Sequence, residues 1–176
     1  MKKIIYTAIF LISLTASTQE IKNTKLTKQE LIKAAKEIIK STRTCALITQ
    51  DKKGISRTRT MDPFLPEKNL TIWFGTNPKS RKVKEIKNNN KVTLYYRDKD
   101  DTGYVTIYGI ATLINKQELK NKYWKNSWKS FYPNKKESYL LIKVTPISME
   151  IVSPPRNIIG SDSTWKPPTV YFNAKK

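Results

Sequence analysis

The feature that most constrains the fold is a series of short runs rich in β-branched and aromatic residues, each followed by a turn. Glycine, proline, asparagine or aspartate lies between most of these runs. Alternating apolar positions over this length are typical of β-strands. The expected strands are 44–49, 55–61, 70–76, 91–98, 104–114 and 138–145, the last extended by 147–152. Because few helices alternate with them, an antiparallel barrel or α+β architecture is favoured over a parallel sheet.

Three segments have the spacing of helices. Thr27 and Glu30 predict a capping box at the start of the first helix, whose apolar face is Leu31, Ala35, Ile38 and Ile39. A second, short helix is expected over residues 80–89. The third is expected from Asn115 to about Tyr132, with an aromatic trio that the spacing places in the core: Trp124, Trp128 and Phe131.

Glycine and proline predict two irregularities. Gly109 interrupts the fifth strand and indicates a bulge or a close approach of two backbones. The segment 161–172 contains Pro167 and Pro168 and is expected to be largely irregular.

The first residues have the pattern of an export signal. Lys2 and Lys3 precede an apolar run over 4–14 that is too short to span a bilayer, and small residues follow at 15–17. We therefore expect residues 1–19 to be a signal peptide and 20–176 to be one domain, exported to the periplasm or another extracytoplasmic space. A short N-terminal membrane anchor is the alternative; after signal removal no transmembrane segment is expected.

The composition excludes several kinds of chemistry. The chain contains no histidine and one cysteine, Cys45, which lies in an apolar run and is expected to be a small buried side chain. Histidine-based triads and most zinc sites are therefore excluded, and no metal site is expected. The net charge of +20 is spread along the chain, so a basic solvated surface is favoured over a specific nucleic-acid site.

The stretch "WFGTNPKSRK" places cations where a helix begins. Arg81 and Lys82 are unfavourable there, because the first turn of a helix carries partial positive charge. A bound phosphate would reverse that cost, with Ser80 as the helix cap and Thr76 adding a hydroxyl. Arg57 or Arg59, on one face of the preceding strand, could complete a phosphomonoester site. A solvated basic turn is the alternative.

Residues 73–83, "WFGTNPKSRKV", resemble the flavin-phosphate segment of the pyridoxamine 5'-phosphate oxidase-like proteins. "SRTRTM", "VTLYYRD", "GYVTIYGIATLI", "VTPISMEIV" and "TWKPP" are similar, in the same order, to segments of the general stress protein branch. The resemblance covers roughly Leu26 to Phe172. It implies a six-stranded antiparallel split β-barrel with peripheral helices, usually a homodimer that binds FMN in a cleft between subunits.

The resemblance also implies residue roles. It assigns the phosphate and ribityl chain to Thr76, Ser80, Arg81 and Lys82. Arg59 would reach the phosphate or the polar edge of the flavin. The backbone from Arg59 to Asp62, with Thr60 and Met61, would lie near the isoalloxazine ring. Trp73 and Phe74 would belong to the barrel wall, and Trp165 would either close the site or pack.

The sequence departs from the family in two places. The triplet Arg-Pro-Met is Arg59-Thr60-Met61 here, and the basic, histidine-containing C-terminal motif of true pyridoxamine 5'-phosphate oxidases has no counterpart. Oxidation of pyridoxamine phosphate itself is therefore not expected. Three functions stay open: an FMN-dependent oxidoreductase acting on an unknown small molecule, a non-catalytic carrier of flavin, heme or deazaflavin, and a cationic protein that binds polyanions.

Overall fold

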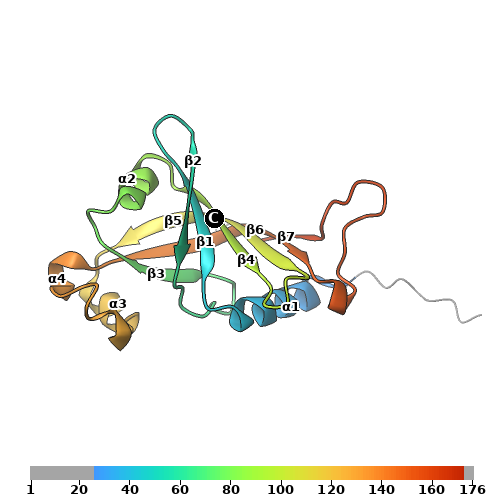
Figure 1. Ribbon diagram of the computed structural model, residues 1–176, viewed down its shortest axis with the longest axis horizontal. Helices are drawn as coiled ribbons and strands as arrows, with labels where there is room; N and C mark the ends of the chain where they lie inside the picture. Colours follow the sequence, from blue (N-terminus) through green and yellow to red (C-terminus); the bar gives the residue numbers. More distant parts are fainter. Residues whose placement is uncertain (1–25, 173–176) are drawn as a thin grey trace, which may run out of the picture.

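An antiparallel sheet that curls into half a barrel organises the chain (Figure 1). The computed structural model describes residues 26–172, so the predicted signal peptide, residues 1–19, lies outside them. The strand order is β2-β1-β4-β5-β6-β3, and β7 pairs with β6. The strands are β1 (Cys45–Gln50), β2 (Ser56–Met61), β3 (Ile72–Thr76), β4 (Lys91–Arg97), β5 (Tyr104–Ile114), β6 (Leu140–Val152) and β7 (Thr169–Tyr171). The predicted antiparallel split barrel is confirmed, with a short seventh strand added.

The long strand β6 curls the sheet because it changes partner halfway along. On one edge, the first half of β6 pairs with β3 and the second half with β7. On its other edge, β6 pairs with β5 from Leu141 to Val152. The register shifts between Tyr108 and Gly109, where Pro146 faces Gly109. A Cβ atom on Gly109 would lie 2.6 Å from the carbonyl oxygen of Thr145. The predicted bulge and close backbone approach at Gly109 are therefore both confirmed.

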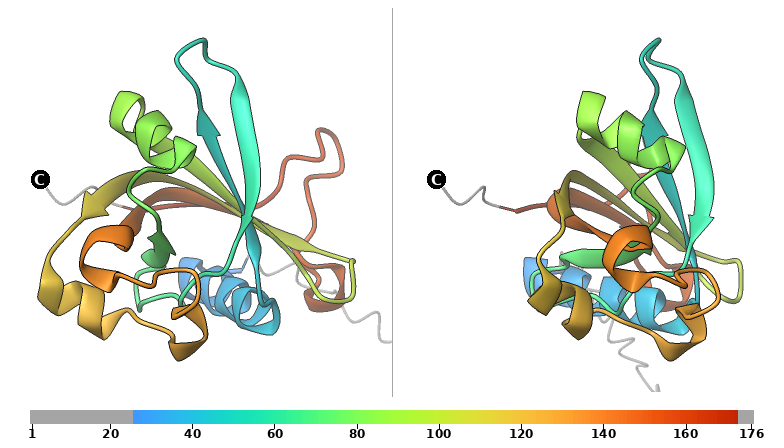
Figure 2. Two further views of the ribbon diagram at one scale, coloured as in Figure 1. Left: turned by 60° about the vertical axis from the view of Figure 1, so that its left-hand side comes forward. Right: turned by 90° about the vertical axis from the view of Figure 1, so that its left-hand side faces the viewer.

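Two helices follow the predicted pattern. In α1 (Lys28–Ser41) both hydrogen bonds of the Thr27–Glu30 capping box are present, and the predicted apolar face is buried. This helix lies under the curled sheet, on the side away from α2 (Arg81–Asn88) (Figure 2). No helix among residues 26–172 has the length and apolar composition needed to cross a membrane. Cys45 is buried at the start of β1, and burial raises the pKa of its thiol to about 12, so it is the expected buried side chain.

The prediction of one helix from Asn115 to Tyr132 is wrong. The segment forms α3 (Gln117–Lys122), a 3-10 turn, η1 (Asn126–Trp128), and, beyond the predicted range, α4 (Lys135–Ser138). Trp124 and Trp128 pack edge-to-face with each other and join an aromatic cluster over β3, but Phe131 is 72% exposed. Helical spacing placed the three on one face, whereas the broken chain bends around Tyr139 and leaves Phe131 outside.

The C-terminal segment is more regular than its prolines suggest. After β6 comes a second 3-10 turn, η2 (Pro154–Arg156), then an irregular loop, and then β7. Pro167 and Pro168 lack amide hydrogens but precede β7, so they remove no donor from its three pairs with β6. The expectation of a largely irregular tail is confirmed for residues 161–168, and β7 is the exception.

Candidate anion-binding site

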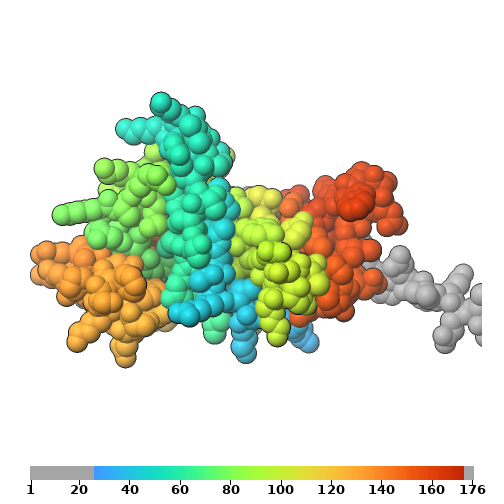
Figure 3. Space-filling model, in the orientation of Figure 1, coloured from blue at the N-terminus to red at the C-terminus, as the bar shows by residue number. Residues whose placement is uncertain are grey.

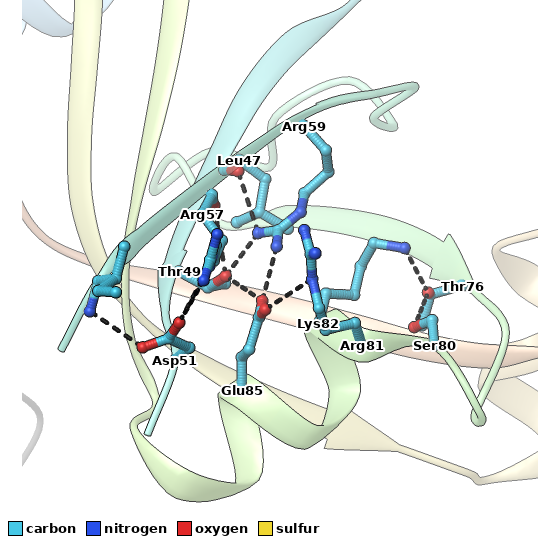
Figure 4. Close-up of polar contacts among 11 residues, drawn as sticks. Leu47, Thr49, Asp51, Arg57, Arg59, Thr76, Ser80, Arg81, Lys82 and Glu85 are labelled. Atoms are coloured by element: carbon cyan, nitrogen blue, oxygen red, sulfur yellow. Dashed lines mark hydrogen bonds and ion pairs between the residues drawn. The ribbon is translucent and has the colours of Figure 1, made fainter. Parts of the chain in front are cut away.

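The start of α2 brings the predicted phosphate residues together. Strand β3 ends at Thr76, the chain turns through residues 77–80, and α2 begins at Arg81. Figure 4 shows that Arg59, from β2, extends toward Glu85 on α2, beside Arg81. Arg57 instead forms an ion pair with Asp51, with 2.8 Å between Nη2 and Oδ2. Of the two candidate arginines, only Arg59 therefore reaches the cluster.

A buried carboxylate, Glu85, lies at the centre of the cluster. Its Oε2 accepts hydrogen bonds from Thr49 Oγ1 at 2.5 Å and from Arg59 Nη2 at 2.6 Å. Arg81 Nε lies 3.0 Å from Oε1 as an ion pair, although Oε1 has no hydrogen-bond donor among the described residues. Burial by itself would raise the pKa of Glu85, but the bonds from Thr49 and Arg59 and the charges of both arginines outweigh burial and lower it. Glu85 is therefore ionised at neutral pH.

The remaining donors line the turn itself. Lys82 Nζ lies 3.3 Å from Thr76 Oγ1, which lies 3.2 Å from Ser80 Oγ. Ser80 precedes the helix but makes no side-chain cap bond, so the predicted cap is wrong, because its hydroxyl pairs with Thr76 instead. Burial, followed by the charges of Arg59 and Arg81, lowers the pKa of Lys82 in spite of the opposing effect of Glu85.

The charges of the cluster do not balance. Arg59, Arg81 and Lys82 carry three positive charges and Glu85 carries one negative charge, so two positive charges are in excess. The first amides of α2 also lack acceptors within the helix, which adds partial positive charge at the same place. Two hydroxyls and two unneutralised charges at a helix start suit a dianionic phosphomonoester. The residues present therefore fit the phosphate end of FMN.

Three further residues predicted for the flavin site lie away from the cation cluster within one chain, and their roles near the flavin ring stay predictions. Thr60 points to the opposite face of β2 from Arg59, since strand side chains alternate. Met61 is buried in the core, opposite Cys45 on β1. Trp165 lies in the loop before β7, at the other end of the molecule from α2 (Figure 1), and is 86% exposed. Of the predicted site residues, the structure therefore brings five together within one chain: Arg59, Thr76, Ser80, Arg81 and Lys82.

Sequence reasoning missed Glu85 and Thr49. Glu85 is the only acidic residue between Lys79 and Asn90, and it follows Arg81 by four residues, the spacing of a helical ion pair. That local signal could have indicated it. Nothing local connects Thr49, on β1, to α2, since only the folded sheet brings the two within hydrogen-bonding distance.

A second carboxylate, Asp62, has balanced partners. Its Oδ1 lies 2.5 Å from Lys125 Nζ, and its Oδ2 accepts a hydrogen bond from Trp128 Nε1 at 2.9 Å. Lys125 also lies over the rings of Phe64 and Trp128. One cation meets one anion here, so this cluster joins the aromatic region to the end of β2 and has no excess charge for an anion.

Comparison with solved structures supports the fold. General stress protein 26 from Bacillus anthracis is 24% identical, with a TM-score of 0.65 over 81% of this chain and 98% of that one. A Clostridium acetobutylicum protein related to general stress protein 26 of B. subtilis is 19% identical, with a TM-score of 0.67 over 83% and 96%. A pyridoxamine 5'-phosphate oxidase-related, FMN-binding protein from Nostoc punctiforme is 13% identical, with a TM-score of 0.62 over 86% and 100%. Among curated proteins, none matches the sequence.

A family model gives the assignment. The model described as "Pyridoxamine 5'-phosphate oxidase like" matches residues 30–154, which is most of the chain and includes the whole cation cluster. The match runs from α1 to the end of β6, through all six strands of the half-barrel. The chain belongs to the pyridoxamine 5'-phosphate oxidase-like family.

Proposed function

We propose that this protein binds FMN through the cation cluster at the start of α2 and acts as a flavin-dependent oxidoreductase on a small molecule. The observation that carries the proposal is the excess of two positive charges beside Thr76, Ser80 and the open first turn of α2. A lone basic turn would be hydrated and mobile in its side chains, whereas Arg59 and Lys82 are partly buried and held by hydrogen bonds.

Each residue of the cluster has a separate task in this proposal. Arg81, whose side chain is 67% exposed, and Lys82 neutralise the phosphate, while Thr76 and Ser80 orient it through their hydroxyls. Arg59 is fixed by Glu85 and by Thr49, so its position is set before a ligand arrives. FMN, when bound, supplies hydride or single-electron chemistry. The protein supplies the charge and the orientation.

We also propose a homodimer, because the cluster lies at an open surface of the single chain and a large outer face of the sheet has little charge. That outer face runs across β1, β4, β5 and β6 and is formed by Ala46, Ile48, Thr93, Tyr95, Thr106, Tyr108, Ser148 and Glu150. Lys91 and Arg97 share this face at the two ends of β4, so its cations lie at the margins and its middle is uncharged apart from Glu150. Sedimentation velocity tests this proposal, and a monomer at micromolar concentration would contradict it.

A non-catalytic carrier is the second candidate, and one observation favours it. The carboxylate of the cluster is paired with Arg59 and Arg81 and stays ionised, so it offers no free acid for turnover. Mass spectrometry of the co-purifying small molecule distinguishes FMN from heme or a deazaflavin. Reduction of the bound flavin by NAD(P)H and reoxidation by a small-molecule acceptor distinguish an oxidoreductase from a carrier.

The decisive experiment compares two double variants of α2 by FMN fluorescence quenching. Arg81→Ala with Lys82→Ala should weaken FMN binding by at least about a hundredfold, because two charge-assisted contacts to phosphate are lost. Lys84→Ala with Lys87→Ala removes the same charge from exposed positions of the same helix and should change the affinity little. Equal weakening by both pairs would show a general charge effect and would contradict the site.

Export is proposed from residues 1–17 alone. The intact mass of the chain recovered from an expressing cell's envelope measures it. Loss of the first 17 to 19 residues would support cleavage of a signal peptide, whereas the full-length mass would contradict it and support the N-terminal anchor.

A further inference from the structure

The end of the molecule opposite α2 carries an exposed apolar surface that, within one chain, lies away from the cation cluster. A cavity of about 840 Å³ lies there, between the start of α1 and the segment 156–171. Figure 3 shows the loop before β7 standing out from the body of the molecule at this end. We call this end the terminal surface and define it by Leu26, Lys28, Ile159, Trp165 and Lys166.

Trp165 is the most exposed large apolar side chain of residues 26–172, at 86%. Its backbone has a φ of 57°, in the left-handed region that a non-glycine residue rarely adopts. Hydrogen bonds hold this conformation: the Trp165 amide donates to Ser161 O at 2.8 Å, and the Ser161 amide donates to Lys166 O at 3.0 Å. The backbone hydrogen bonds of the loop therefore hold the indole in its exposed position.

Other apolar side chains surround the same loop. Ile159 is 51% exposed and Leu26 is 37% exposed, and both line the cavity. Three exposed apolar side chains together are unusual on the surface of a chain with 34 lysines and arginines, and such a patch is characteristic of an interaction site. Tryptophan with neighbouring aliphatic side chains is characteristic of surfaces that enter the boundary between lipid headgroups and acyl chains.

The charged residues that line the cavity are mostly basic: Lys28, Arg156 and Lys166, against one acid, Asp162. Lys28 and Lys166 line the cavity, and neither forms an ion pair with a carboxylate among the described residues. The sequence adds Lys22 and Lys25 just before Leu26, and Lys175 and Lys176 after Phe172. Tyr171 is bonded to Lys28 through its carbonyl oxygen, so both flanking segments leave the described structure close to this surface.

We propose that the terminal surface docks on a membrane containing anionic lipids, with Trp165 and Ile159 entering the headgroup boundary and the lysines facing the lipid charges. The surface itself supports a membrane as the occupant, because Lys28 and Lys166, unpaired within the described residues, lie beside exposed apolar side chains and complement anionic headgroups. Docking needs neither a spanning helix nor the flavin, so it is independent of the proposed function.

The experiment uses the chain from Glu20 onward, so that the apolar leader does not bind lipid by itself. This part contains every buried residue of the described structure and therefore its whole core. Binding is measured by flotation with vesicles of phosphatidylcholine alone and with vesicles of phosphatidylcholine and phosphatidylglycerol in equal parts. We expect binding to the anionic vesicles only, weakening as salt is added.

Paired variants locate the binding surface. Trp165→Ala should weaken vesicle binding roughly tenfold through the loss of apolar burial, and Lys166→Gln roughly fivefold through the loss of one charge. Phe131→Ala and Lys129→Gln make the same kinds of change between η1 and α4, at the opposite end of the molecule (Figure 1), and should have no effect. Circular dichroism checks that all four variants are folded.

Three outcomes would overturn the proposal. Equal binding of Trp165→Ala and the parent would remove the indole from the contact. Equal weakening by Lys129→Gln and Lys166→Gln would reduce the effect to overall charge. Unchanged vesicle binding by Trp165→Ala together with weaker FMN binding or loss of a dimer would assign the loop to a second copy of this chain.

Discussion

The cluster around Glu85, on α2, and the cluster around Asp62, after β2, differ in charge balance. That difference separates a candidate binding site from a purely structural contact. Glu85 is buried and faces three cations, whereas Asp62 is partly exposed and faces Lys125 alone. A buried anion outnumbered by cations leaves charge for a ligand. The Asp62–Lys125 pair has no net charge and leaves none for a ligand. With the hydrogen bond from the Trp128 indole, it holds the aromatic region in place.

The largest expected effect is on stability, at Glu85. Glu85→Gln leaves the guanidinium of Arg59 mostly buried without its counter-ion, and we expect a loss of about 3 kcal/mol in the free energy of unfolding. Urea denaturation measures it. Added inorganic phosphate should restore part of this stability, because an anion can then occupy the cluster. No rescue by phosphate would show that the excess charge does not face a ligand.

The second effect, at Asp62, should be smaller. Asp62→Asn breaks a pair in which both side chains are partly exposed, so we expect a loss of about 1 kcal/mol. FMN affinity should be unchanged, and phosphate should give no more stabilisation than it gives the parent. An affinity loss comparable to that of Arg81→Ala with Lys82→Ala would erase the distinction between the two clusters.

The smallest effect is a pH dependence that belongs to the Glu85 cluster only. The pKa of Lys82 is lowered in the folded, ligand-free protein, mainly by burial. As pH rises through that lowered value, Lys82 loses its charge and FMN binding should weaken at a pH below the ordinary range for lysine. Lys82→Arg should remove this alkaline loss, because arginine stays protonated. Titration of FMN binding against pH measures it, and identical profiles for parent and variant would contradict the role of Lys82.

The outcomes at Ser80 and Phe131 show why local pattern reasoning failed where it did. A serine before a helix is a good cap, but in the folded protein its hydroxyl pairs with Thr76. Phe131 has helical spacing from Trp124 and Trp128, yet the chain breaks at η1 before reaching it. At Ser80 a second local contact, four residues away, replaced the cap, and at Phe131 the break in the helix removed the expected face.

The sequence by itself determined the elements that depend on neighbouring residues. Alternating apolar residues predicted the strands, and the Thr27–Glu30 capping box predicted the start of α1. Gly109 predicted the irregularity in β5. The sequence also placed Thr76, Ser80, Arg81 and Lys82 together, because one strand end and one helix start are adjacent in the chain.

Only the tertiary structure decided the contacts between distant segments. It joined Arg59 and Thr49 to Glu85, paired β7 with β6, and put the loop of Trp165 at the far end of the molecule. The physical reason is that a local pattern fixes which face of an element is buried. Which charged groups meet is set by how the sheet curls and which strands it makes neighbours.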